Sequence, residues 1–72
     1  MVTPQMSSFT QDSLGYRARR LRISQMLTRR ELAGMAGVSL NEVNLLECNL
    51  PVTLDAKRKL LKELWARKLA RN

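Results

Sequence analysis

Apolar residues recur at helical spacing along the chain, and this pattern predicts a small all-α domain. The first helix is expected to begin at Asp12 or Ser13, since either residue caps a helix N-terminus. Its buried stripe consists of Leu14, Ala18 and Leu21. Residues 1–11 show no helical period and contain a proline and paired serines, so we expect a flexible tail there. The folded domain is therefore expected to span residues 12–72.

The last helix is the longest that the pattern predicts. Thr53 is placed to cap it, and no glycine or proline follows Leu64, so we expect one helix that reaches about Ala70. Its apolar stripe consists of Leu54, Leu60, Leu61, Leu64, Trp65 and Leu69. Trp65 and Leu69 project past the part that covers the core, which makes them candidates for a dimer surface. The alternative for Trp65 is that it caps the core.

The middle of the chain predicts two short helices joined by a tight turn. Thr28 and Glu31 form a capping box, in which the hydroxyl and the carboxylate each bond a backbone N–H of the other residue. Ser39 and Glu42 repeat this pattern at the start of the second helix. Gly37 lies between them, where a helix ends in the left-handed conformation that favours glycine. Two capped helices around a glycine corner predict a helix-turn-helix.

This segment resembles the lambda-repressor/Cro (Xre-type) helix-turn-helix family, whose usual pattern is close to LTxxELAxxxGVSxxxVxxxE. The matching positions are Leu27, Thr28, Glu31, Leu32, Ala33, Gly37, Val38, Ser39, Val43 and Glu47. The resemblance implies a four- to five-helix domain that binds double-stranded DNA, usually as a homodimer on two-fold sites. The family commonly has a fifth helix after a break, whereas this chain has no break after Leu64.

Two loop positions depart from the family pattern. Met26 stands where the family commonly has glycine or asparagine, and methionine is uncommon in a left-handed conformation. We therefore expect either that the first helix ends differently or that Met26 packs inward with Leu27. Asn49 replaces the family's usual glycine, and asparagine tolerates the left-handed conformation.

Charge supports a nucleic-acid partner. The 72 residues include 13 basic and 6 acidic side chains, for a net charge of +7. Such a basic small domain is typical of nucleic-acid binders, although a basic protein with solvated helix faces fits equally. The chain has no histidine and a single cysteine, so neither a metal site, a cofactor nor an internal disulfide is expected. No signal peptide, membrane span or catalytic constellation is visible, which favours a cytoplasmic protein that is not an enzyme.

The resemblance also implies which residues meet DNA. With Val43 set inward, the outer face of the second short helix carries the candidate base contacts Leu40, Asn41, Asn44 and Leu45. Asparagine binds adenine through two hydrogen bonds, and leucine packs against a thymine methyl group. The candidate phosphate contacts are Thr28, Arg29, Arg30, Ser39, Lys57 and Arg58. In the family an arginine in the first helix pairs with a glutamate at the end of the recognition helix, which predicts an ion pair between Arg22 and Glu47.

The expected function is that of a sequence-specific transcriptional regulator, repressor-like, in a bacterium or phage. An alternative belongs to another class, because the outer face is apolar and has no base-reading arginine. In that alternative the same scaffold binds a protein through Leu40, Leu45 and Leu50, as an adaptor, an anti-repressor or an antitoxin-like partner.

Overall fold

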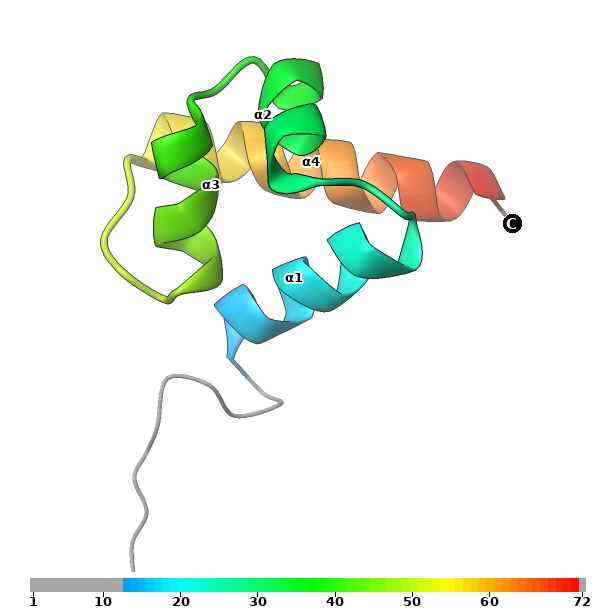
Figure 1. Cartoon of the computed structure of the whole chain (residues 1–72), viewed down its shortest axis with the longest axis horizontal. Coiled ribbons are helices and arrows are strands. Elements are labelled where there is room, and N and C mark those ends of the chain that lie inside the picture. Colours follow the sequence, from blue (N-terminus) through cyan, green and yellow to red (C-terminus); the bar gives the residue numbers. More distant parts are fainter. Residues whose placement is uncertain (1–12, 72) are drawn as a thin grey trace, which may run out of the picture.

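The computed structural model describes the backbone of residues 13–71 and the side chains of residues 13–67. In that part of the chain every regular element is a helix, as the apolar pattern predicts (Figure 1). The elements are α1 (Leu14–Ser24), α2 (Arg29–Ala36), α3 (Leu40–Glu47) and α4 (Leu54–Arg71). None of these helices is long and apolar enough to cross a membrane. The predicted tail, residues 1–11, lies outside the described residues.

The first and last helices begin at the capping residues that the sequence predicts. The Ser13 hydroxyl accepts a hydrogen bond from the Tyr16 N–H at 3.1 Å, and the Thr53 hydroxyl accepts one from the Ala56 N–H at 3.2 Å. From Leu54 the chain continues as one helix of 18 residues. The described residues therefore form four helices, and no break separates a fifth helix from α4.

The core lies where α1 and α2 both pack against α3 and α4. In Figure 1, α4 runs behind α2 and α3, and it packs against all three of the other helices. The buried cluster consists of Ala18, Leu32, Ala33, Val43, Leu46, Leu60 and Leu64. Trp65 is partly buried and packs against this cluster, which agrees with the alternative that it caps the core. Leu54, the first residue of the predicted apolar stripe, is 62% exposed and lies outside the core. The side chain of Leu69 lies outside the described residues.

The start of α1 touches the end of α3 through a glycine. The N–H of Gly15 donates to the Asn49 side-chain Oδ1 at 2.9 Å. A Cβ on Gly15 would lie 2.6 Å from the Leu46 carbonyl oxygen and 2.8 Å from that of Glu47. Asn49 holds its position in the left-handed conformation, with φ of 58°, as the sequence predicts. Only glycine at position 15 permits this close approach of two helices.

Met26 contradicts both expectations for the connection between α1 and α2. It adopts the left-handed conformation, with φ of 60°, and its side chain is 89% exposed. The preceding turn explains this conformation, because Met26 N–H bonds the Ile23 carbonyl and Leu27 N–H bonds the Arg22 carbonyl. These bonds satisfy the last carbonyl groups of α1 in the manner of a left-handed helix end. The connection therefore has the left-handed backbone conformation that usually requires glycine, although the residue at this position is methionine.

We expect Gly15→Ala to destabilise the domain by about 1–3 kcal/mol, because the added methyl group meets backbone oxygens that move only if α3 moves. Gly34→Ala is the matched control, since Gly34 is an exposed residue of α2 whose Cβ would have nothing within 4 Å. That change should stabilise the domain by up to about 1 kcal/mol. Urea unfolding followed by circular dichroism measures both effects. Equal effects of the two substitutions would contradict the contact between α1 and α3.

Candidate nucleic-acid interface

Residues 28–47, which we call the α2–α3 unit, form two eight-residue helices joined by a short turn. Gly37 ends α2 in the left-handed conformation, with φ of 76°. The N–H groups of Gly37 and Val38 both bond the Ala33 carbonyl, at 2.9 and 3.0 Å. Val38 then packs against the core. The turn thus fixes the direction in which α3 leaves α2.

Both helices of the α2–α3 unit begin with complete capping boxes. The Thr28 hydroxyl accepts from the Glu31 N–H at 3.0 Å, and the Glu31 carboxylate accepts from the Thr28 N–H at 2.8 Å. At α3 the corresponding distances between Ser39 and Glu42 are 3.1 and 2.8 Å. Since Thr28 and Ser39 are exposed, both predicted phosphate contacts are accessible.

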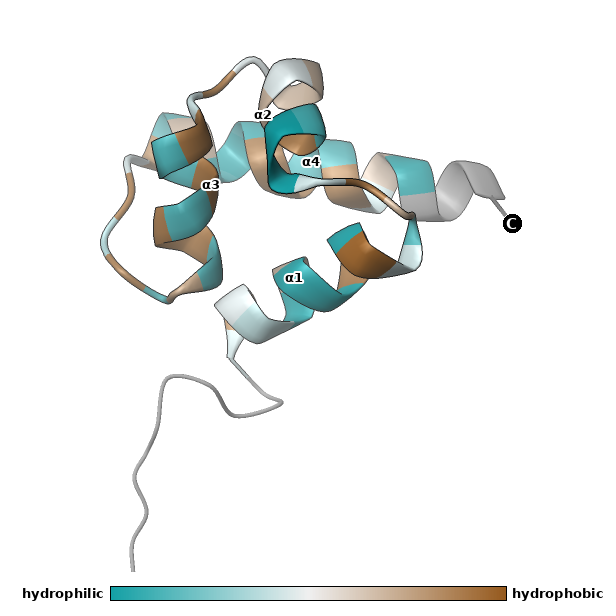
Figure 2. Ribbon diagram, in the orientation of Figure 1, coloured by the Kyte–Doolittle hydropathy of each residue, from teal (hydrophilic) through white to brown (hydrophobic). Residues whose placement is uncertain are grey.

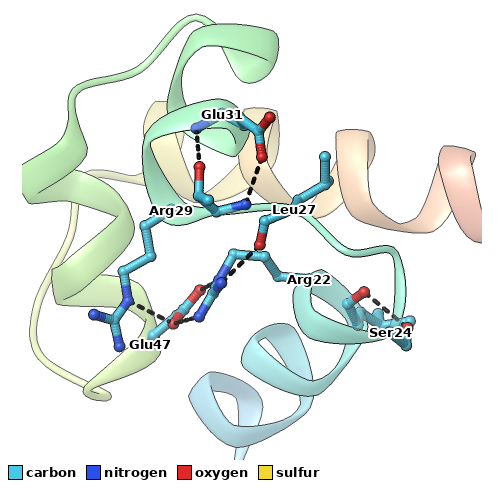
Figure 3. A network of polar contacts seen from close by, with 8 residues as sticks. Arg22, Ser24, Leu27, Arg29, Glu31 and Glu47 are labelled. Atoms are coloured by element: carbon cyan, nitrogen blue, oxygen red, sulfur yellow. Dashed lines mark hydrogen bonds and ion pairs between the residues drawn. The ribbon is translucent and has the colours of Figure 1, made fainter.

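A buried ion-pair network joins α1, α2 and α3 (Figure 3). The Arg22 Nε lies 2.6 Å from Glu47 Oε2, and Arg22 Nη2 donates to Glu47 Oε1 at 3.1 Å. Arg22 Nη1 donates to the Leu27 carbonyl at 2.8 Å, which ties the α1–α2 connection to the same network. The pair of Arg22 and Glu47 that the sequence predicts is therefore present, and its geometry is bidentate.

The network has a third member that sequence reasoning did not include. Arg29, the first residue of α2, donates from Nε to Glu47 Oε1 at 3.1 Å. The exposed fraction of the side chain is 2% for Glu47, 10% for Arg22 and 44% for Arg29. The buried carboxylate is thus shared by one buried and one half-exposed guanidinium group. Such networks fix orientation more reliably than they add net stability.

The outer face of α3, defined by Leu40, Asn41, Asn44 and Leu45, is only partly open to solvent. Asn41 is exposed, and the other three residues are half-buried. The opposite face, with Val43, Leu46 and Glu47, is buried, as the helical spacing predicts. No lysine or arginine occurs in α3, so its outer face offers amide and apolar groups alone.

An open groove runs beside α3. Its lining includes Asn41 and Leu45 of α3 together with Pro51, Val52 and Thr53 of the following loop. Leu50 in the same loop is 53% exposed. Figure 2 shows hydrophobic residues along this loop between α3 and α4. Leu45, Pro51 and Val52 give this groove an apolar part at the border of the outer face.

The other candidate phosphate contacts lie on two helix starts. Arg30 is exposed in the first turn of α2. On α4, Arg58 is exposed and Lys57 is half-buried, at the edge of a second groove that Leu14, Asn49 and Leu50 also line. Further along α4, Lys59 pairs with Asp55 at 3.0 Å, and Arg67 pairs with Glu63 at 3.7 Å. In these pairs Asp55 and Glu63 partly neutralise Lys59 and Arg67, so less of the positive charge of α4 is available to an external anion.

Gln25 is a structural residue that the sequence pattern does not indicate. It follows the last residue of α1 and is only 8% exposed. Its side-chain Nε2 donates to the Leu64 carbonyl of α4 at 3.1 Å. A polar residue at the end of a helix is expected to be exposed. Gln25 is buried because the fold places it against α4.

Comparison of the chain with protein-family models, curated proteins and solved structures finds no match. The function is therefore inferred from the geometry and chemistry of the α2–α3 unit.

The capping box of α2 should weaken in acid. Hydrogen bonds from the Thr28 backbone N–H and then from its hydroxyl lower the pKa of Glu31, because they stabilise the ionised carboxylate. A lowered pKa in the folded state means that the stabilisation is present at neutral pH and is lost as the pH falls through that pKa.

We expect the amide proton of Thr28 to follow this titration in NMR spectra, with a midpoint below the ordinary glutamate range. In Glu31→Gln the same amide should show no such midpoint, since the glutamine side chain does not ionise in this range. A midpoint at or above the ordinary range in the unchanged protein would contradict the bond between Glu31 and Thr28.

Proposed function

We propose that this chain is a DNA-binding domain of the helix-turn-helix class and acts as a repressor-like transcriptional regulator in the cytoplasm of a bacterium or in a phage-infected cell. The observation that supports this most strongly is the α2–α3 unit, whose two capped, accessible helix starts are held at a fixed angle by Gly37 and by the network around Glu47. A rigid pair of short helices with this arrangement suits the major groove of B-DNA, which admits one α-helix.

In the proposed complex α3 lies in the major groove. Asn41 and Asn44 bind adenine through their amide groups, and Leu40 and Leu45 pack against thymine methyl groups. Arginine and lysine are the side chains that most often recognise guanine, and α3 has neither. The outer face of α3 is therefore suited to A·T base pairs.

The backbone of the duplex is held from the helix starts. Thr28, Arg29 and Arg30 at α2 and Ser39 at α3 supply hydroxyl and guanidinium donors, while Lys57 and Arg58 at α4 add positive charge. Contacts of this kind set the register of a protein on DNA and carry no sequence information. A homodimer on a two-fold site fits the class. Of the two candidate contact residues, Leu69 is the one proposed here, because Trp65 packs against the core.

Amide-shift NMR of labelled protein with a mixed-sequence duplex at low salt tests the proposed docking. We expect shifts at residues 28–30 and 39–45, and an affinity that falls roughly a hundredfold between about 50 and about 200 mM salt as about four phosphates release their counterions. Shifts confined to α4, or no shifts, would contradict the proposal.

Selectivity for A·T pairs gives a second test, on an operator selected from a random duplex library. Replacing a contacted thymine by uracil removes one methyl group and should weaken binding about fourfold, since burying one such group is worth about 0.8 kcal/mol. A thymine outside the footprint of the protein is the control. If uracil has no effect at any position, Leu40 and Leu45 do not contact thymine methyl groups.

A second candidate function is that Leu40, Leu45 and Leu50 bind an apolar protein surface. Two observations favour it: Leu45 lines the groove beside α3, and Leu50 is 53% exposed in the following loop. Leu45→Arg separates the two functions. A DNA-binding domain should keep or gain affinity for the duplex, because arginine adds a phosphate or base contact. A protein-binding module should lose its partner, because a charge then enters an apolar interface.

A further inference from the structure

Glu47 has more partners than an ion pair between α1 and α3 requires. Arg22 already engages both carboxylate oxygens, Oε2 through Nε at 2.6 Å and Oε1 through Nη2 at 3.1 Å. Arg29 adds a second bond to Oε1 from the half-exposed first turn of α2. Arg22 alone balances the formal charge of Glu47, so the second arginine leaves one positive charge in excess.

The charge of the network points outward. One carboxylate and two guanidinium groups leave one net positive charge, and the side chains of Glu47 and Arg22 are 2% and 10% exposed. Arg29, which is 44% exposed, is the member that solvent or a ligand reaches. The uncompensated charge of the network is therefore presented at Arg29.

The orientation of Arg29 follows from which nitrogen it uses. Its Nε is taken by Glu47, and Figure 3 shows the two Nη groups on the side of the guanidinium that is turned away from the carboxylate. Within the described part of the chain, Glu47 is the one group that bonds the Arg29 side chain. Two parallel N–H groups in this fork match two oxygens of a phosphate.

We propose that Glu47 is a positioning residue, which holds Arg29 so that its two Nη groups meet one phosphate of the DNA backbone. This inference rests on the proposed function, because it assigns that phosphate to the duplex bound by the α2–α3 unit. Holding the guanidinium in place before binding removes the cost of ordering a long side chain. It also explains why an arginine occupies the start of α2, where its charge opposes the helix dipole.

Lysine substitution separates a positioned guanidinium from a simple positive charge. A lysine at position 29 keeps the charge, but its single ammonium nitrogen lacks the planar fork that donates two parallel N–H groups to one phosphate. We expect Arg29→Lys to weaken duplex binding about tenfold, nearly as much as Arg29→Gln, which corresponds to one lost charge-assisted hydrogen bond. Arg30 is exposed, carries the same charge and has no bonded partner among the described residues. Arg30→Lys is therefore the matched control: it keeps the positive charge that an unpositioned phosphate contact supplies, so it should weaken binding far less than Arg29→Lys does.

A direct measurement in the free protein follows the Nε–H signals of the two arginines by NMR. The Nε–H of Arg29 should exchange slowly and lose this protection in Glu47→Gln, whereas that of Arg30 should exchange fast in both proteins. If Glu47→Gln does not fold, the comparison of Arg29→Lys with Arg30→Lys still decides the matter.

The outcomes separate the inference from the proposed function. If the unchanged protein binds no duplex, the proposed function fails, and the phosphate role of Arg29 fails with it. If the unchanged protein binds and Arg29→Lys binds equally well, the proposed function stands and the positioning role of Glu47 is overturned. Fast exchange of the Arg29 Nε–H in the free protein would overturn that role as well.

Discussion

The buried carboxylate of Glu47 is the point at which three helices of this small domain are held together. A charge that is 2% exposed is costly unless it is paired, and the fold pairs it twice, with Arg22 of α1 and Arg29 of α2. Arg22 also bonds the Leu27 carbonyl, so the connection between these two helices is fixed by the same group. A large change in the angle between α2 and α3 would break the bond between Arg29 and Glu47.

The apolar core and the polar network act on different parts of the α2–α3 unit. The core holds its inner side through Leu32, Val43 and Leu46, which α4 covers. The capping boxes and the glycine turn define where each helix starts and ends, whatever lies beneath. Apolar packing tolerates sliding of one helix along another, whereas a bidentate ion pair does not. Together they leave two helix starts exposed in one fixed arrangement.

Local chemistry made much of this predictable from the sequence. Ser13, the two capping boxes, Gly37 and the left-handed Asn49 act within a few residues of themselves, so their patterns are visible along the chain. The four helices follow from apolar spacing for the same reason. The pair of Arg22 and Glu47 came from a family resemblance, since no local rule relates residues 25 positions apart.

Three features that sequence reasoning missed, at Gly15, Gln25 and Arg29, depend on distant partners. Gly15 resembles any helical glycine until the end of α3 lies against it, and Gln25 resembles a surface residue until α4 covers it. Arg29 was expected to be a free phosphate ligand, and its bond to Glu47 follows only from the angle between α2 and α3. Met26 shows the opposite case, because the surrounding turn imposes a conformation that its own preference disfavours.

The helix α4 continues without a break past the core, so its final turns extend directly from the domain. Among the residues of α4 whose side chains the structure describes, Leu64 is the last fully buried one, and the helix continues to Arg71. In a continuous helix each added residue moves the following residues by about 1.5 Å along the axis and turns them by about 100° around it. A one-residue insertion after Trp65 would therefore turn the residues beyond it around the helix axis, while Trp65 and the core cluster keep their places. Insertions at this point can thus change the direction in which the last residues of α4 face, without a change in the fold.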